Sequence, residues 1–168
     1  MPIIAADFSI RLSGGAANSV GNASLGGAKS SSVAPETLDN LFDAVSSGEA
    51  SAGDVEYRCV YLHNANASSQ MEPAKVFISA DTPLSGTTIA IGVGTSAVNA
   101  TEQTIADENT APSGVSFSSP TTLGTALSLG NIPAGQHRAL WIRWTVNAAT
   151  GPSASDAGQL TYNADFTS

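Results

Sequence analysis

The chain has 168 residues, a length that fits a single domain covering residues 1–168. Its hydrophobic fraction of 42% is too high for a disordered chain, although only 12% of its residues are charged, half of the usual ~25%. The net charge is −8 and the six basic residues are spread singly along the chain, which leaves no basic patch for phosphates and excludes nucleic acid as an expected direct partner.

The first residues and the distribution of apolar residues indicate whether the protein is expected to be secreted or to enter a membrane. The first seven residues carry no basic charge and start no apolar stretch of signal-peptide length. No run approaches the ~20 apolar residues that a membrane-spanning helix needs. We therefore expect no membrane partner, and a protein that is made and kept in a cytoplasm or leaves it only by lysis. The single cysteine, Cys59, lies in an apolar run and is expected to be a buried, inert thiol.

Alternation of apolar and polar residues with a period of two recurs along the chain and predicts β-strands. The segments that show it, or that are short and rich in β-branched and aromatic residues, are residues 7–12, 55–62, 76–78, 89–93, 115–117, 123–129, 139–146 and 160–166. Seven or eight strands separated by turn-rich spacers of variable length predict an all-β domain. We expect an antiparallel β-sandwich, either immunoglobulin-like or a jelly roll.

The clearest strand, residues 139–146, carries two tryptophans of opposite parity. Trp144 shares one face with apolar residues, whereas Trp141 shares the other with Arg143. At most one of the two tryptophans can face the core, and we expect it to be Trp144. Trp141 then either lies beneath a loop or is exposed, in which case it would be a good anchor for an interface.

One short helix is predicted in the first third of the chain. Residues 38, 41, 42 and 45 are apolar with helical spacing, and Pro35 and Thr37 are start signals. The same residues are also compatible with an irregular segment that places Leu41 and Phe42 under the sheet. Ahead of it, residues 13–37 form a long Gly/Ser-rich stretch, which predicts either a flexible arm or a loop that is ordered only against a partner.

Residues 92–97 read G-V-G-T-S-A directly after a predicted strand, a pattern that resembles a dinucleotide-binding loop. The next residues are poorly helical, and no acidic residue stands about 20 positions further on to hold a ribose. A glycine-bearing strand end is the better interpretation. The two histidines, His63 and His137, are not accompanied by a cluster of further ligands that would complete a zinc site with Cys59.

The densest acidic group comprises Glu102, Asp107 and Glu108. Neighbouring acids in a loop are usually solvated, and calcium binding is left open as the alternative. A glycosidase would need two carboxylates that face each other across a cleft. We therefore expect no catalytic residue, no cofactor and no metal, and we keep a small hydrolase only as a remote alternative.

Several segments resemble a pattern found in small virion structural proteins of tailed bacteriophages, including capsid decoration (cement) proteins. The resemblance covers most of the chain, and its segments are L-S-G-G-A-A-N at 12–18, N-A-S-L-G-G at 22–27, N-L-F-D-x-V-S at 40–46, G-D-x-E-Y-R-C at 53–59, L-G-x-I-P-A-G-Q at 129–136 and W-I-R at 141–143. It implies an immunoglobulin-like or jelly-roll sandwich that is built into a particle. The motifs are structural and transfer no catalytic residues.

The resemblance does not fix whether such a protein sits on the head or the tail. Together with the disulfide-free, low-charge β domain and its long Gly/Ser-rich stretch, it leads us to expect a non-enzymatic protein of the virion, assembled in the host cytoplasm, that stabilises the head by binding the lattice of the major capsid protein. A homo-oligomer, dimer or trimer, is left open. The side chains expected at an interface are Trp141, Arg143, Leu25, Leu41 and Phe42. The alternative is a tail fibre, baseplate or carbohydrate-binding host-recognition domain, which predicts exposed aromatic side chains in one groove.

Overall fold

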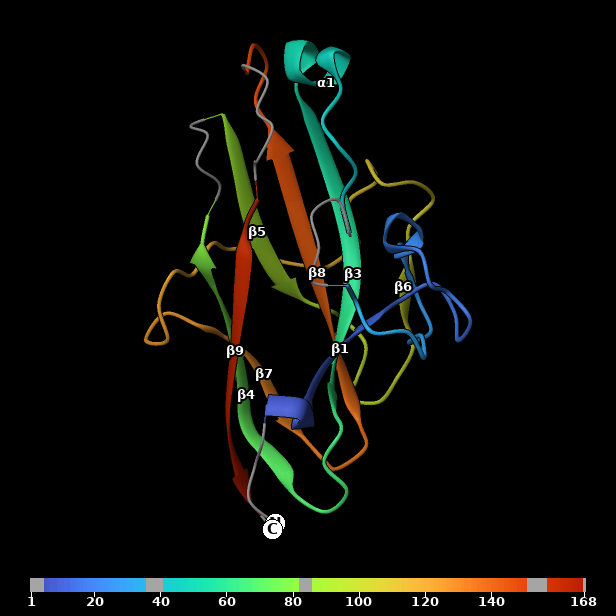
Figure 1. Cartoon of the computed structure of the whole chain (residues 1–168), viewed down its shortest axis with the longest axis vertical. Helices are drawn as coiled ribbons and strands as arrows, with labels where there is room; N and C mark the ends of the chain where they lie inside the picture. Colours follow the sequence, from blue (N-terminus) through green and yellow to red (C-terminus); the bar gives the residue numbers. More distant parts are fainter. Residues whose placement is uncertain (1–4, 36–40, 82–85, 151–156, 168) are drawn as a thin grey trace.

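The computed structural model describes residues 5–35, 41–81, 86–150 and 157–167, and it confirms an all-β chain. Figure 1 shows the arrangement of the strands. The elements are η1 (Ala5–Asp7), β1 (Phe8–Leu12), η2 (Gly21–Ala23), β2 (Gly26–Gly27), α1 (Ser47–Ala52), β3 (Asp54–Asn64), β4 (Gln70–Ala80), β5 (Thr87–Val93), β6 (Glu102–Thr104), β7 (Leu127–Ile132), β8 (His137–Val146) and β9 (Gln159–Thr167). No helix in the described ranges is long and apolar enough to cross a membrane.

The strands form three antiparallel sheets. A four-stranded sheet has the order β1-β3-β8-β5, a three-stranded sheet has the order β7-β4-β9, and β2 pairs with β6 in a short two-stranded sheet. The long strands β3 and β8 pair along ten residues, from Asp54 opposite Val146 to His63 opposite His137. This pair is the centre of the four-stranded sheet and sets which side chains share a face.

One face of the four-stranded sheet shares a hydrophobic core with the three-stranded sheet. The buried residues of this core come from both sheets and include Val60, Leu62, Leu140, Ile142 and Trp144 from β3 and β8, and Met71, Val76, Ile78, Leu129 and Ile132 from β4 and β7. We call this face of the four-stranded sheet the inner face. Trp144 therefore packs in the main core, as its parity predicts.

The opposite, outer face of the four-stranded sheet is also buried. Cys59, Tyr61, Ala139 and Trp141 form a second cluster, which the chain covers with Ile105 and, less completely, with Leu25, Tyr57, Val115 and Phe117. The cover comes from two connections, residues 13–35 and residues 94–118. In Figure 1 the first of them, in blue, lies with β6 on one side of the four-stranded sheet.

Residues 13–35 are held by the chain's own strands. Ser30 donates its backbone N–H to the carbonyl of Leu12, and Cys59 in β3 donates to the carbonyl of Ser24. Arg11 and Val33 form an isolated antiparallel bridge at the edge of β1. The stretch predicted to be a flexible arm or a partner-ordered loop thus makes its contacts within the chain over 13–35, whereas residues 36 and 37 lie outside the described residues.

Two sequence predictions differ from the structure. Residues 115–117 form no strand, and the chain there makes only an isolated bridge from Ser118 to Ile91. The described ranges contain nine strands, rather than seven or eight, because the short β2 and β6 carry no alternating pattern.

The predicted helix lies later in the chain than expected. Residues 41–46 are not helical, and α1 begins after Ser46, whose side chain accepts a hydrogen bond from the N–H of Glu49 while the Glu49 side chain accepts one from the N–H of Ser46. This capping box fixes the start of the helix. Leu41 and Phe42 are half-buried against the main core, as the alternative interpretation proposed, and residue 38 lies outside the described residues.

Candidate functional site: an acidic cluster around a buried arginine

The middle of β3 places two charged residues on the inner face, where apolar residues are expected. Arg58 lies opposite Ile142 and Glu56 lies opposite Trp144, so both share the face of the main core. Arg58 is 0% exposed and Glu56 is 6% exposed. Buried charges are retained only where other groups compensate them, and this pair is therefore the centre of the candidate site.

Every nitrogen of the Arg58 guanidinium has a partner. Nε donates to the carbonyl of Leu41 at 3.0 Å, Nη1 donates to the carbonyl of Tyr57 at 3.2 Å, and Nη2 donates to the carboxylate of Glu108 at 2.5 Å. The guanidinium also lies over the ring of Phe42, 5.2 Å from its centroid. Arg58 thereby fixes two connections, residues 41–43 and the loop around Glu108, to the end of the sheet.

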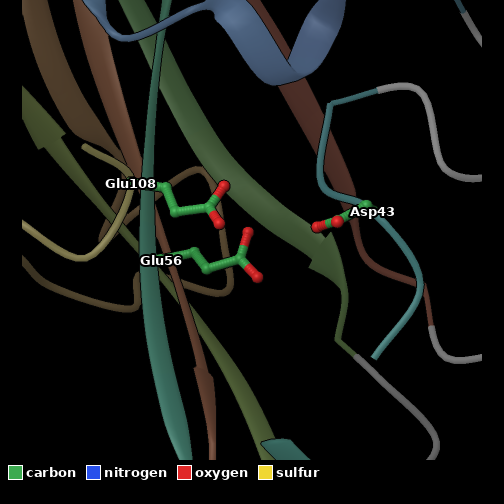
Figure 2. A group of neighbouring side chains, drawn as sticks. All are labelled: Asp43, Glu56 and Glu108. Atoms are coloured by element: carbon green, nitrogen blue, oxygen red, sulfur yellow. The ribbon is translucent and has the colours of Figure 1, made fainter. Parts of the chain in front are cut away.

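Three carboxylates converge beside Arg58. One oxygen from each of Asp43, Glu56 and Glu108 lies within 4.8 Å of the other two. Figure 2 shows Glu56 and Glu108 side by side, with Asp43 reaching toward them from a separate segment. Burial raises the pKa of Glu56 to about 7; Arg58 opposes this rise, and the negative charges of Glu108, Asp43 and Asp54 add to it.

A second group of carboxylates, Glu49, Asp54 and Glu56, shares Glu56 with the first. Two of its members have structural partners. Glu49 caps α1 through the N–H of Ser46, and Asp54 accepts a hydrogen bond of 2.7 Å from the side chain of Asn109. The first group, Asp43, Glu56 and Glu108, therefore has more free ligand capacity, and we call it the acidic triad.

Glu102, which the sequence placed in one acidic group with Glu108, lies elsewhere, at the start of β6 within the connection of residues 94–118 that covers the outer face. It is 3% exposed, and its carboxylate accepts hydrogen bonds from the N–H of Ser96 at 2.9 Å and from the hydroxyl of Thr95 at 3.0 Å. Burial would raise its pKa, but these hydrogen bonds outweigh burial and lower the pKa to about 2. Its own N–H donates to the hydroxyl of Tyr61.

We expect Glu102→Gln to lower the free energy of unfolding by about 2–3 kcal/mol at pH 7, because a neutral amide replaces a charged acceptor of two partly buried hydrogen bonds. A depressed pKa contributes stability that is present above the unfolded pKa of about 4.5 and is lost as the pH falls toward 2. Urea unfolding of the parent and of Glu102→Gln at pH 7 and at pH 3 measures how much stability the charged carboxylate contributes. If the two proteins differ in free energy of unfolding by the same amount at both pH values, the lowered pKa of Glu102 is contradicted.

The glycines at 92 and 94 are explained by packing. A Cβ at Gly92 would lie 2.5 Å from Cγ1 of Val115, and a Cβ at Gly94 would lie 2.3 Å from an oxygen of Glu102. A loop follows β5, and the next element is the short strand β6. The pattern thus allows the covering connection to approach the sheet closely.

The histidines and the cysteine form no joint metal site. The Nδ1 of His63 lies 3.1 Å from the carbonyl of Gln136, and His137 packs edge-on against Tyr61 with 4.8 Å between ring centroids. Burial and nearby positive charge lower the pKa of both histidines, that of His137 to about 4. Cys59 is fully buried, and burial raises the pKa of its thiol.

The side chains predicted at an interface are distributed over both faces of the sheet. Trp141 is 0% exposed in the outer cluster, because the two covering connections lie over it. Leu25 is part of that cover, and Arg143 lies over the ring of Phe117 at 5.3 Å. In this structure Trp141 presents no surface to a partner, which corrects its interpretation as an exposed anchor. Leu41 and Phe42 lie at the other site, beside Arg58.

Sequence reasoning missed Arg58, Glu56 and Asp43 as a cluster. A signal was present, because Glu56 and Arg58 have the same parity as the apolar Val60 and Leu62 and so occupy core positions of an otherwise apolar strand face. Charged residues at such positions indicate a buried ion pair. The segment that carries Asp43 is distant in sequence, so its approach could not be inferred.

No protein-family model, curated protein or solved structure matches this chain. The roles of the acidic triad and of the covered outer face therefore have to be argued from the chain's own residues.

Proposed function

We propose that the chain is a non-enzymatic structural protein of a tailed-phage virion, and specifically a decoration protein that binds the assembled lattice of the major capsid protein. The proposed fold type is an antiparallel β-sandwich, immunoglobulin-like or jelly-roll. The core shared by the four-stranded and the three-stranded sheet supports this type. The sequence segments that resemble virion structural proteins support the proposal that the chain is part of a virus particle.

The observation that carries the proposal is how firmly the two long connections are fixed to the sheet. Tyr61 donates to the carbonyl of Gly27 at 2.5 Å, Ile105 donates its N–H to the carbonyl of Leu25, and Arg58 binds Glu108. A loop surface that is already held in one conformation loses little entropy when it docks. Such a surface suits a protein whose only task is to bind.

The mechanism needs no chemical step. A protein that binds the assembled lattice better than its free subunits stabilises the assembled state by mass action. The net charge of −8 would favour a basic partner surface and disfavour non-specific association with nucleic acid. The proposal therefore predicts selective, saturable binding to capsids.

The test is co-sedimentation of the purified protein with undecorated capsids and, separately, with tails from the same virus. We expect binding to capsids that saturates at a fixed ratio to lattice sites, and none to tails. Binding to tails alone, or to neither particle, would contradict a decoration role.

A pair of variants sharpens this test. Val20 and Val33 are 57% and 55% exposed and lie on the connection that covers the outer face. If this connection contacts the lattice, Val20→Asp with Val33→Asp will weaken capsid binding at least tenfold while leaving the melting temperature of the protein unchanged. Val45→Asp, at an exposed position before α1, is the matched control.

The alternative is a tail fibre, baseplate or carbohydrate-binding domain, which would present aromatic side chains to a sugar. In the described ranges both tryptophans and Tyr61 are buried. Tyr57 and Phe117 are half-buried, with their ring centroids 5.5 Å apart, and could contribute to such a platform. Binding to tails but not to capsids would favour this alternative.

A further inference from the structure

We propose that Asp43, Glu56 and Glu108, the acidic triad, bind one calcium ion where residues 41–43, β3 and the loop around Glu108 meet. This inference concerns the isolated chain and does not rest on the proposed role in a virion. It goes beyond the sequence analysis, which expected no metal and considered calcium only for the acids at 102, 107 and 108.

The ligand set of the triad fits calcium better than magnesium. Its three carboxylate oxygens lie within 4.8 Å of one another, close enough to share one ion. Calcium takes about six to eight oxygen ligands in flexible geometry, and several of them can be carboxylates. Magnesium requires near-ideal octahedral geometry, keeps several waters and is usually bound by only one or two carboxylates. Three converging carboxylates are therefore the donor set expected for calcium.

The buried carboxylate of Glu56 has one oxygen that no hydrogen bond satisfies, although it is ion-paired with Arg58. Glu56 is 6% exposed, yet its Oε2 atom accepts no hydrogen bond from any described residue. The Nη2 of Arg58 forms an ion pair with this oxygen at 3.1 Å, but of its two N–H groups only the one that donates to Glu108 makes a hydrogen bond with a carboxylate. A buried carboxylate oxygen without a hydrogen bond requires an explanation, and a bound ion shared with the neighbouring carboxylates of Asp43 and Glu108 provides one.

The balance of charge points the same way. Three ionised carboxylates and one guanidinium sum to −3 + 1, or −2, which a divalent cation would neutralise. Arg58 cannot turn further toward the triad, because its Nε and Nη1 are bound to the carbonyls of Leu41 and Tyr57.

The position of the triad explains what the ion would do. Asp43 and Glu108 come from two separate connections, and Glu56 comes from the central strand β3. A calcium ion bound by all three would cross-link both connections to the sheet. We therefore expect calcium to raise the melting temperature of the protein.

Terbium luminescence provides a direct test, because Tb³⁺ occupies calcium sites and is excited through a nearby tryptophan. The ring of Trp144 lies 5.8 Å from that of Phe42, the neighbour of Asp43 in the chain. After treatment with a chelator, the full chain is titrated with Tb³⁺ and then with Ca²⁺ or Mg²⁺ as competitor. We expect saturation at one Tb³⁺ per chain, displacement by Ca²⁺ and much weaker displacement by Mg²⁺.

Two variants complete the experiment. Asp43→Asn removes an exposed carboxylate of the triad, and Asp107→Asn removes an exposed carboxylate beside Glu108 that is outside it. We expect Asp43→Asn to weaken binding of Tb³⁺ and Ca²⁺ at least tenfold and to abolish the calcium-dependent rise in melting temperature, with Asp107→Asn unchanged. No sensitised emission, equal affinity in Asp43→Asn and the parent, or equal displacement by magnesium would each overturn the proposal.

Capsid binding repeated with chelator present tests the proposed function separately.

Discussion

Deletion of residues 13–33 is expected to unfold the protein or to leave a state without fixed packing on the outer face. The deleted segment covers the fully buried Trp141 together with residues 94–118, and it supplies the partners of Cys59 and Tyr61 in β3. A tryptophan side chain buries about 150–250 Å², so at about 25 cal/mol per Å² its full exposure would cost about 4–6 kcal/mol, which is the upper limit of this contribution while residues 94–118 remain. This is comparable to the whole stability of many domains.

Circular dichroism and tryptophan fluorescence during a thermal melt measure this effect. Two single substitutions in the same segment, one expected to destabilise the protein and one expected to have little effect, are measured alongside the deletion. Leu25→Ala, which loses contacts with the outer cluster, should lower the free energy of unfolding by about 1–2 kcal/mol, whereas Val20→Ala, at an exposed position, should change it by less than about 0.5 kcal/mol. A deletion variant that melts like the parent would show that residues 13–33 are a dispensable arm.

Substitution of Arg58 by methionine is expected to lower the free energy of unfolding by about 3–5 kcal/mol at pH 7, because it leaves Glu56 buried without its cationic neighbour. Loss of the guanidinium also releases the carbonyl of Leu41 and the carboxylate of Glu108. The loss should be smaller at pH 5. A carboxyl whose folded pKa is raised contributes stability that is present below the unfolded pKa of about 4.5 and is lost as the pH rises through the folded pKa, which is about 7 in the parent.

Urea unfolding of Arg58→Met and the parent at pH 7 and pH 5 tests whether the loss of stability decreases at the lower pH. A double variant tests whether the buried charge of Glu56 causes the loss. Glu56→Gln removes the buried charge, so Arg58→Met with Glu56→Gln should recover most of the stability that Arg58→Met loses. A loss below 1 kcal/mol for Arg58→Met, or no recovery in the double variant, would mean that the buried charge of Glu56 is not what makes Arg58 necessary.

The all-β class and most strands could be predicted, because alternation reports directly on a sheet with one face in a core. Residues 139–146 show this best, since the parity of the two tryptophans correctly assigned Trp144 to the main core. The same reasoning failed at 115–117. Val115 and Phe117 alternate because they cover the outer cluster, and they do so from a loop.

The candidate site could be predicted only in part. The parity of Glu56 and Arg58 indicates a buried ion pair, but their partners come from other segments of the chain. Arg58 and Glu108 are fifty positions apart, and their contact arises only because the loop after β6 returns to the edge of β3, where Tyr57 donates its N–H to the carbonyl of Glu108. Glu102 and Glu108 illustrate the same limit. They are near neighbours in the sequence, but Glu102 is held by Thr95 and Ser96, and Glu108 by Arg58.

The melting temperature of undecorated capsids, measured at increasing concentrations of the purified protein, tests the decoration role most directly. The account predicts a rise that levels off once the bound protein reaches its fixed ratio to lattice sites, because selective binding stabilises the assembled state. A capsid melting temperature that stays constant while the protein is bound, or an absence of binding at any concentration, would contradict it.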